Sequence, residues 1–315
     1  MEMRDILDFV KIEHTLFSLP FVLIGFVLAD RQFGTDSTDL LWIIVAAVGA
    51  RGLAMALNRV VDKEIDANNP RTASRHLPSG KMTDTEAFAL SGLFLAMLLF
   101  SAWMLNQVAL KMAWLPVVAF VIYPYTKRIS WLCHFWIGLC LALAPAGAWV
   151  AISADTHGWA AITGVVPIAG GERALLWYPE IFFISLGVAM WITAFDINYA
   201  RMDVEIDRDQ GIKSFPSRFG SKATSVLSVF LTLGWVICFC LTKLQEVDDT
   251  RDYRYLLWIP TVFVMGILNI YVMTKLVEDS DKTKTAMESF QQNLFRCSML
   301  TGWVLLGSLL VMQSQ

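Results

Sequence analysis

Long apolar segments constrain this chain more than any other feature, because a soluble core cannot bury so many of them. Of the 315 residues, 56% are hydrophobic and only 17% are charged, and the mean hydropathy is +0.53. Helices of about 17 to 25 apolar residues are long enough to cross a bilayer. Nine such spans can be placed, at residues 14–30, 40–57, 87–105, 108–124, 131–151, 176–195, 224–242, 256–275 and 296–313. The sequence therefore predicts an all-α polytopic membrane protein that forms one domain, residues 1–315.

Two polar stretches interrupt this pattern. Residues 153–178 contain a Gly-Gly pair and a proline, which favours a longer external loop with some helix. Residues 277–292 are charged and are expected to form a cytoplasmic helical linker before the last span. The fourth span is the weakest of the nine, because it is short and contains Lys111 and Pro116.

The basic residues predict the orientation of the chain. Short cytoplasmic loops are enriched in Lys and Arg, and the connections around residues 59–81, 127–128, 201–222 and 275–296 are the basic ones here. An odd number of spans then places the N-terminus in the cytoplasm and the C-terminus outside. No small-residue cleavage site follows the first span, so we expect that span to be retained in the membrane, by inference the bacterial inner membrane.

Acidic side chains gather at the cytoplasmic ends of two spans. At about 100° per residue, the members of each group fall on one helix face. The first group is Asn58, Asp62 and Asp66, and the second is Asp196, Tyr199, Asp203 and Asp207. Carboxylates gathered in this way repel one another unless a cation joins them. Mg²⁺ prefers oxygen ligands and is usually bound by a few carboxylates together with substrate phosphates, so the pattern predicts a diphosphate site.

Basic residues in the same region are candidates for binding the diphosphate. Arg71, Arg75, Lys127 and Lys213 lie in the loops beside the two acidic groups. Arg51 lies inside the second span, two helical turns before Asn58, where a charge is costly without an anion or a water-filled cavity. We expect Arg51 to bind a substrate carboxylate or a diphosphate oxygen, although a structural pairing with an aspartate is the alternative.

The cysteines and histidines of the sequence do not predict a metal site or a disulfide. The five cysteines lack metal-ligand or Cys-x-x-Cys spacing and are expected to be buried thiols. His134 and His157 are interpreted as loop or interface residues, while His14, at the start of the first span, is a weaker candidate for substrate contact. The charges follow the sides of the membrane and give no nucleic-acid signature, and no obligate protein partner is evident.

These motifs resemble those of the UbiA family of intramembrane aromatic prenyltransferases. The family's first motif, Asn-Asp-x-x-Asp-x-x-x-Asp, is similar to residues 58–66, and the run that follows it in the family resembles residues 71–80. Its second motif resembles residues 196–207, followed here by Gly211, Ile212, Lys213 and Ser214. A Tyr-Pro-x-x-Lys-Arg element is matched from Tyr123 to Arg128. The resemblance implies nine helices around a cavity that opens to the cytoplasmic face and laterally to lipid.

The chain departs from the family pattern at two places. Arg59 stands where many members have Asp, which removes one possible ligand. The first helix, from Lys11 to Pro20, differs from that of typical 4-hydroxybenzoate enzymes and resembles more a branch assigned to menaquinone synthesis. The resemblance therefore leaves two aromatic acceptors open, 4-hydroxybenzoate and 1,4-dihydroxy-6-naphthoate.

The resemblance also implies roles for the candidate residues. The reaction would be Mg²⁺-dependent transfer of a polyprenyl group from an allylic diphosphate to the aromatic acid. The metal would be bound, largely through the diphosphate, by Asn58, Asp62, Asp66, Asp196, Asp203 and Asp207. Arg71, Arg75, Lys127 and Lys213 would bind diphosphate, Tyr199 would contact diphosphate or cation, and Arg51 would orient the acceptor carboxylate. Asp196 is also a candidate to help remove the ring proton.

Two other functions fit the sequence less well. A CDP-alcohol phosphotransferase also uses intramembrane acids, but the Asp-Gly-x-x-Ala-Arg run expected of that family is not found in this sequence. An ion-coupled transporter would place its acids near the membrane midplane, whereas these acids gather at one face beside basic loops. Haem or a lipid alcohol remains an alternative prenyl acceptor.

Overall fold

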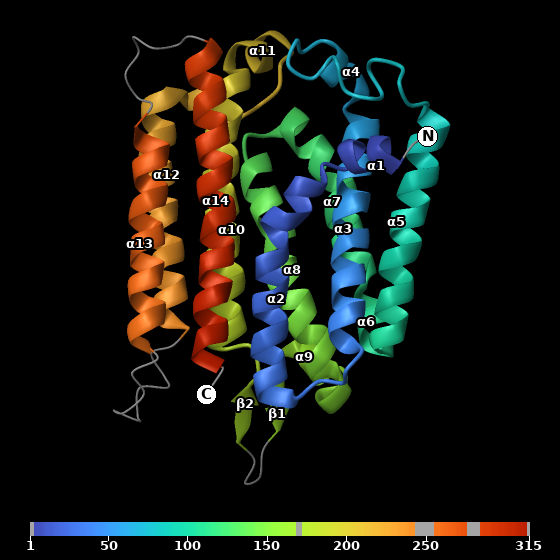
Figure 1. The fold of residues 1–315 in the computed structure, drawn as a ribbon, viewed down its shortest axis with the longest axis vertical. Helices are drawn as coiled ribbons and strands as arrows, with labels where there is room; N and C mark the ends of the chain where they lie inside the picture. The colour runs from blue at the N-terminus through green and yellow to red at the C-terminus, as the bar shows by residue number, and fades with distance from the viewer. Residues whose placement is uncertain (1–2, 168–171, 243–254, 276–283, 314–315) are drawn as a thin grey trace.

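The computed structural model describes residues 3–167, 172–242, 255–275 and 284–313 as a bundle of long helices (Figure 1). Within these ranges, nine helical segments are long and apolar enough to cross a membrane. They are α2 (Ile12–Phe33), α3 (Asp39–Val61), α5 (Asp84–Leu105), α6 (Gln107–Met112) with α7 (Trp114–Ile129), α8 (Cys133–His157), α10 (Glu180–Tyr199), α12 (Phe215–Leu241), α13 (Tyr255–Thr274) and α14 (Lys284–Gln313). The predicted all-α membrane fold is confirmed.

Short elements mark the two ends of the bundle. The helices α1 (Met3–Phe9), α4 (Lys63–Ala67) and α11 (Val204–Asp209) lie together at one end, here called the motif end (Figure 1). The helix α9 (Ala160–Thr163) and an antiparallel hairpin of β1 (Val165–Pro167) and β2 (Arg173–Leu175) lie at the opposite end, the hairpin end. Helix α14 finishes at the hairpin end, as an odd number of crossings requires.

Three segments differ in detail from the sequence-based expectation. The fourth span is two helices, with Asn106 capping α6 by accepting the Ala109 N–H at 2.8 Å. Helix α12 begins at Phe215, before the predicted 224, and contains a non-helical Gly220 at φ 80°. The polar residues from Lys284 onward are the first turns of α14 rather than a separate linker; the earlier part of that predicted linker lies outside the described residues.

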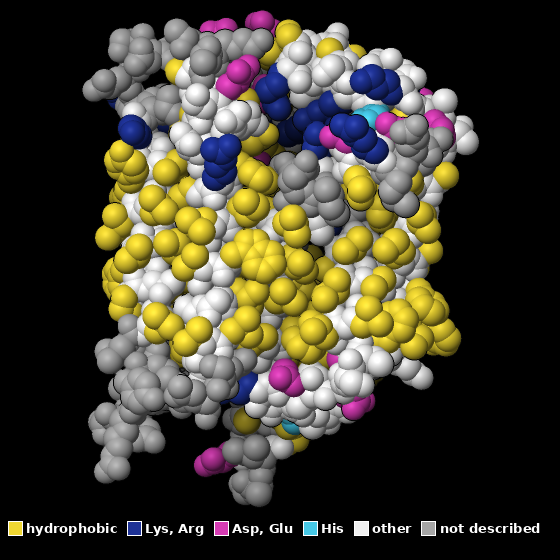
Figure 2. All heavy atoms as spheres, in the orientation of Figure 1, with side chains coloured by type: hydrophobic (Ala, Val, Ile, Leu, Met, Phe, Trp, Pro, Cys, Tyr) yellow, Lys and Arg dark blue, Asp and Glu magenta, His cyan; other side chains and the backbone are white. Residues whose placement is uncertain are grey.

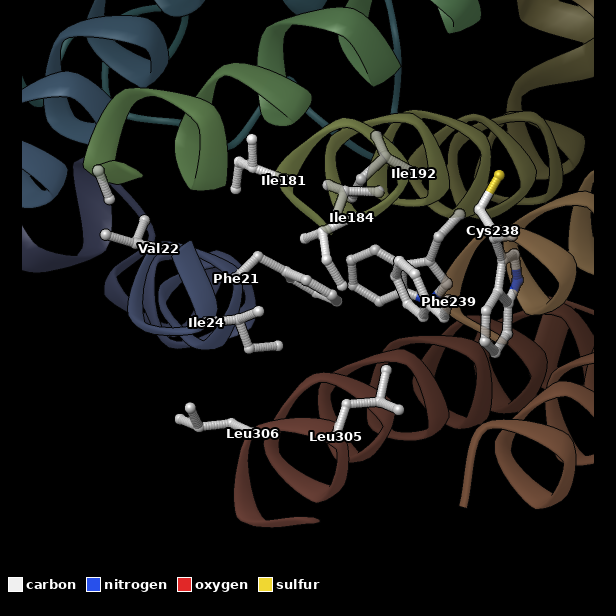
Figure 3. Packing of buried hydrophobic residues seen from close by; sticks show 14 of the residues in the cluster. Phe21, Val22, Ile24, Ile181, Ile184, Ile192, Cys238, Phe239, Leu305 and Leu306 are labelled. Carbon is white, nitrogen blue, oxygen red and sulfur yellow. The ribbon is translucent and has the colours of Figure 1, made fainter. Parts of the chain in front are cut away.

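The main core joins α2, α8, α10, α12, α13 and α14 through aromatic side chains. Phe21 of α2 points toward Phe239 of α12, with their ring centroids 6.4 Å apart, and Ile184 of α10 lies beside them (Figure 3). Phe21 also packs on Trp191, at 4.6 Å between centroids. Lipid tails are as apolar as these side chains, so close van der Waals packing rather than exclusion from water favours this association.

Small residues allow the helices to approach closely. A Cβ atom added at Gly49 of α3 would lie 2.8 Å from the Leu98 nitrogen of α5. At Gly138 of α8, an added Cβ would lie 2.5 Å from the Ala189 carbonyl oxygen of α10. Small residues at such contacts are typical of membrane helix pairs, and here they fix α3 against α5 and α8 against α10.

Arg59 anchors the N-terminal helix α1 to the bundle. Its Nε donates to the Phe9 carbonyl oxygen at 2.7 Å, and its guanidinium carbon lies 5.6 Å from the centre of the Phe9 ring. Phe9 is fully buried in a second apolar cluster with Leu53, Leu77 and Phe94. The residue that departs from the family motif therefore has a structural partner on the N-terminal segment.

We expect Arg59→Met to destabilise the protein by about 1–3 kcal/mol, because the buried Phe9 carbonyl loses a charged donor. Thermal unfolding in detergent would measure the change. Lys11→Met is a suitable control, since the ion pair of Lys11 with Asp8 is exposed and exposed pairs contribute little. Equal melting temperatures for Arg59→Met and the wild type would contradict the anchoring role.

Candidate active site

A cavity of about 450 Å³ lies inside the bundle between α2, α3, α5, α6, α7, α8 and α10. Most of its wall is apolar, and at one side it reaches Ile162 and Trp177 near the hairpin end. The polar part of the wall is small and comes from helices that carry the acidic motifs or their neighbours. It includes Arg51, Asn58, Tyr123, Asp196 and Tyr199. A cavity of this kind suits a ligand with a long apolar part and a charged end.

Arg51 is the most deeply placed charge on this wall. Its Nε is buried and has no hydrogen-bond partner within the described part of the chain. A buried guanidinium N–H without a partner is costly, so an acceptor atom of a ligand in the cavity would stabilise it. The alternative expectation, a structural pairing of Arg51 with an aspartate, has no support among the described contacts.

The first acidic motif keeps a helical register although helix α3 ends within it. Asp62 joins α3 to α4, and its N–H donates to the Asn58 carbonyl oxygen at 2.9 Å. The Asp66 N–H donates in turn to the Asp62 carbonyl oxygen at 2.8 Å. These bonds span four residues each, as in an α-helix, so Asn58, Asp62 and Asp66 follow one another along one side.

Each carboxylate of the first motif faces a cation. Asp62, only 1% exposed, forms an ion pair of 2.5 Å with Lys127 of α7. Burial raises the pKa of Asp62 above its ordinary value, and the Lys127 ammonium opposes that rise. Asp66 accepts two hydrogen bonds from Nη1 of Arg75, at 2.7 and 2.8 Å. The last turn of α7 and the loop after α4 therefore bring the predicted cations Lys127 and Arg75 to the predicted carboxylates.

The second motif changes helix type along its length. Asp196 and Tyr199 belong to α10, whereas Asp203 ends a 3₁₀ helix, η1 (Ala200–Asp203), and Asp207 lies in α11. A 3₁₀ turn has three residues rather than 3.6, so the four side chains do not follow one continuous α-helical face. Asp196 and Tyr199 line the cavity wall, while Asp207 accepts a hydrogen bond from the Ser214 hydroxyl at 2.6 Å.

Asp203 connects the two motif loops. Arg71 donates to it through Nε at 3.0 Å and through Nη2 at 2.5 Å, and the Asn69 amide donates at 3.0 Å. Burial opposes the charge of Arg71, but these bonds to Asp203 raise its pKa above the ordinary value. The Arg71 guanidinium also lies 5.8 Å from the centre of the Tyr199 ring. Arg71 thus reaches from the loop to the edge of the cavity.

Basic side chains gather around a recess at the motif end, and apolar side chains cover the middle of the face shown in Figure 2. Lys213, one of the predicted phosphate ligands, is directed elsewhere. Its Nζ donates to the Ile129 carbonyl oxygen at 3.0 Å, at the C-terminus of α7, where a cation is favoured by the helix dipole. Its backbone N–H donates to the Lys127 carbonyl oxygen at 2.8 Å, which links this loop to α7.

Some residues of the site could not be recognised in the sequence. His134, interpreted as a loop or interface residue, is 3% exposed, and its Nδ1 lies 2.6 Å from Asp196 Oδ2. Asn69 and Ser214 contact the motif carboxylates directly. Ser214 belongs to the run that resembles the family's second motif, whereas the only signal for Asn69 was its place near the basic loop residues. The side chain of His14 lies outside the described side chains.

The donor atoms of the site fit Mg²⁺ only in part. Among the residues that the structure describes, no group of three His, Cys, Asp or Glu side chains is close enough to bind a metal ion. Carboxylate oxygens are nonetheless the donors that Mg²⁺ prefers, and Mg²⁺ usually shares its ligands with substrate phosphates. The residues therefore fit a metal held jointly with a diphosphate better than a metal bound by the protein alone.

Comparisons with known proteins identify the family of this chain. The model of the UbiA prenyltransferase family matches residues 18–295. A 4-hydroxybenzoate octaprenyltransferase of Vibrio campbellii is 32% identical over 242 residues, which cover 76% of this chain and 74% of that protein. One of Vibrio parahaemolyticus is 31% identical over 228 residues, covering 71% of this chain and 72% of the relative.

Solved structures share the fold over almost the whole length. The apo structure of a UbiA homologue from Aeropyrum pernix K1 has a TM-score of 0.74 and 25% identity, and the match covers 96% of this chain and 98% of that one. A UbiA homologue from Archaeoglobus fulgidus bound to GPP and Mg²⁺ has a TM-score of 0.64 at 15% identity, covering 96% and 99% of the two chains, and supports the fold alone. The family match and the curated relatives favour an enzyme over an ion-coupled transporter. The chain is an integral membrane prenyltransferase of the UbiA family.

Proposed function

We propose that the protein catalyses Mg²⁺-dependent transfer of a polyprenyl group from an allylic polyprenyl diphosphate to an aromatic acid in respiratory quinone biosynthesis. The observation that carries this proposal is the cavity whose polar wall joins Arg51, with its unpartnered Nε, to Asn58, Asp196 and Tyr199. The relatives named 4-hydroxybenzoate octaprenyltransferase support 4-hydroxybenzoate as the acceptor. The hydroxynaphthoate indicated by the first helix is the second candidate.

The diphosphate would bind at the motif end. Each of three cations pairs with a motif aspartate: Arg71, Arg75 and Lys127. A phosphate oxygen could replace the carboxylate as the partner of each cation, so that the cation would remain paired with an anion. Asp62, Asp66, Asp203 and Asp207 would hold Mg²⁺ together with the diphosphate, with Asn58 beside them at the cavity. Bound Mg²⁺ would neutralise the charge of the leaving diphosphate. Lys213 would contribute indirectly, because its backbone N–H donates to the Lys127 carbonyl oxygen and so helps to position Lys127.

The acceptor would bind between the motif end and Arg51. Arg51 would hold its carboxylate, and Tyr199 would present its ring to the positive charge that develops on the allylic carbon. The allylic carbon bonds to a ring carbon, diphosphate leaves, and the ring loses a proton. Asp196, on the same wall, would receive that proton. We assign Asp196 to the acceptor because it lines the cavity wall and its hydrogen-bond partner is His134 rather than a Lys or Arg side chain.

The basic residues at the motif end support a cytoplasmic orientation for the site. Short cytoplasmic connections are enriched in Lys and Arg; the loop after α4 carries Arg71 and Arg75, and α11 itself carries Arg208. The polyprenyl tail would occupy the apolar part of the cavity and continue into the lipid bilayer.

Prenyl transfer by the purified protein in nanodiscs tests the proposal. The assay contains Mg²⁺, a polyprenyl diphosphate and either 4-hydroxybenzoate or 1,4-dihydroxy-6-naphthoate. We expect product from one aromatic acid, and loss of that product when Mg²⁺ is chelated. Failure with both acids, in a preparation that still binds the diphosphate, would overturn the aromatic acceptor and favour haem or a lipid alcohol.

We expect Arg51→Met to raise KM for the aromatic acid about tenfold, because a charge-assisted hydrogen bond contributes roughly 1.5–3 kcal/mol. KM for the polyprenyl diphosphate should stay unchanged. The matched measurement uses an acceptor without the carboxylate, such as phenol in place of 4-hydroxybenzoate, for which variant and wild type should react at equal rates. An equal loss with both acceptors, accompanied by a lower melting temperature, would instead assign Arg51 a structural role.

A further inference from the structure

His134 uses both ring nitrogens inside the protein. Its Nε2 lies 3.0 Å from the backbone nitrogen of Phe215, and its Nδ1 lies 2.6 Å from Asp196 Oδ2. A backbone N–H can only donate, so Nε2 must accept the first hydrogen bond. The ring proton is then on Nδ1, which donates it to the aspartate. The two contacts together fix both the tautomer and the orientation of the ring.

His134 is separated from the substrate by the residue that it contacts. The His134 side chain is 4% exposed, whereas that of Asp196 is 23% exposed and lines the cavity with Arg51 and Tyr123. The imidazole therefore reaches the cavity only through the carboxylate. It holds one oxygen of that carboxylate and so restricts the rotation of the Asp196 side chain.

The backbone around His134 is also held in place. The Thr193 hydroxyl lies 3.2 Å from the His134 carbonyl oxygen, so α8 and α10 are joined one helical turn before Asp196. Phe215 follows Ser214, whose hydroxyl donates to Asp207. The imidazole thus connects the cavity-facing aspartate to the loop that carries the second acidic motif.

We propose that His134 is a positioning residue, which holds the Asp196 carboxylate toward the aromatic acceptor. This role rests on the proposed prenyl transfer and extends it to a residue outside the motifs. The Nδ1–H donor is the part of the side chain that the role requires, because it alone contacts Asp196. The Nε2 acceptor serves the contact with Phe215.

Three substitutions separate these two contacts. His134→Leu fills the space but removes both. His134→Asn keeps an N–H donor near the place of Nδ1, and His134→Gln places its amide near Nε2 instead. For His134→Leu we expect kcat to fall about 10- to 100-fold, the range found when the partner of a functional side chain is removed. KM for the polyprenyl diphosphate should stay within about twofold of wild type, and His134→Asn should recover most of kcat while His134→Gln does not.

The outcomes distinguish the role of His134 from the proposed function itself. An active wild type whose Leu variant retains kcat would overturn the positioning role alone. Recovery by His134→Gln but not by His134→Asn, with melting temperatures that follow activity, would also overturn it and leave only a structural contact with Phe215. A wild type that transfers to neither aromatic acid would overturn the proposed function, and this role with it.

Discussion

Asp62→Asn is expected to lower kcat roughly 100- to 1000-fold, the cost of removing one group that stabilises developing charge in a transition state. Asp62 lies where α3 joins α4 and is almost completely buried. The change keeps the volume and the backbone bonds but removes the negative charge that would hold Mg²⁺ beside the diphosphate. Turnover at saturating substrates, measured at several Mg²⁺ concentrations, tests this expectation.

Two controls separate the loss of a ligand from the loss of an ion pair. Asp84→Asn removes an exposed carboxylate that pairs with Lys63 near the same end, and we expect full activity. Asp62→Asn also leaves the Lys127 ammonium without its partner, which is costly in itself. The double variant with Lys127→Met removes that unpaired charge. If the double variant recovers wild-type turnover, Asp62 acts only as the partner of Lys127, and Lys127 is not required to bind the diphosphate.

The parts of the fold that the sequence predicted are those set by local composition. The nine spans were recognisable because a crossing helix needs a long run of apolar residues wherever its neighbours lie. The order of Asn58, Asp62 and Asp66 was predictable for a similar reason, since hydrogen bonds between residues four apart continue across the end of α3. The 3₁₀ turn before Asp203 was missed, because nothing in helical periodicity distinguishes it.

The contacts that the sequence left unpredicted join residues far apart in the chain. His134 and Asp196 are separated by 62 residues, and Arg59 and Phe9 by 50. Lys213 was expected to bind diphosphate because it lies beside the second acidic motif, yet its amine donates to a carbonyl oxygen at the C-terminus of α7. Hydropathy and motif spacing describe single helices, whereas these partners depend on how α1, α7, α8 and α10 pack together.

Arg71→Ala is expected to lower kcat/KM for the polyprenyl diphosphate about 100-fold. Arg71 is the cation that joins the two motif loops, through paired hydrogen bonds to Asp203, and it also covers the Tyr199 ring at the cavity. A guanidinium offers two parallel donors to a phosphate, and the expected loss corresponds to about 2.7 kcal/mol, within the roughly 1.5–3 kcal/mol of one hydrogen bond to a charged group. Steady-state rates at varied diphosphate and saturating acceptor measure the effect.

Arg71→Lys distinguishes charge from geometry. Lysine keeps the positive charge but cannot form the paired contact, so we expect an activity between those of the wild type and Arg71→Ala. Lys63→Met, which removes a basic side chain from an exposed ion pair, should leave kcat/KM unchanged. The opposing possibility is that Arg71 serves only to hold Asp203. In that case both Arg71 variants would lower the melting temperature while KM for the diphosphate stayed at the wild-type value, because the phosphate would have lost none of its own contacts.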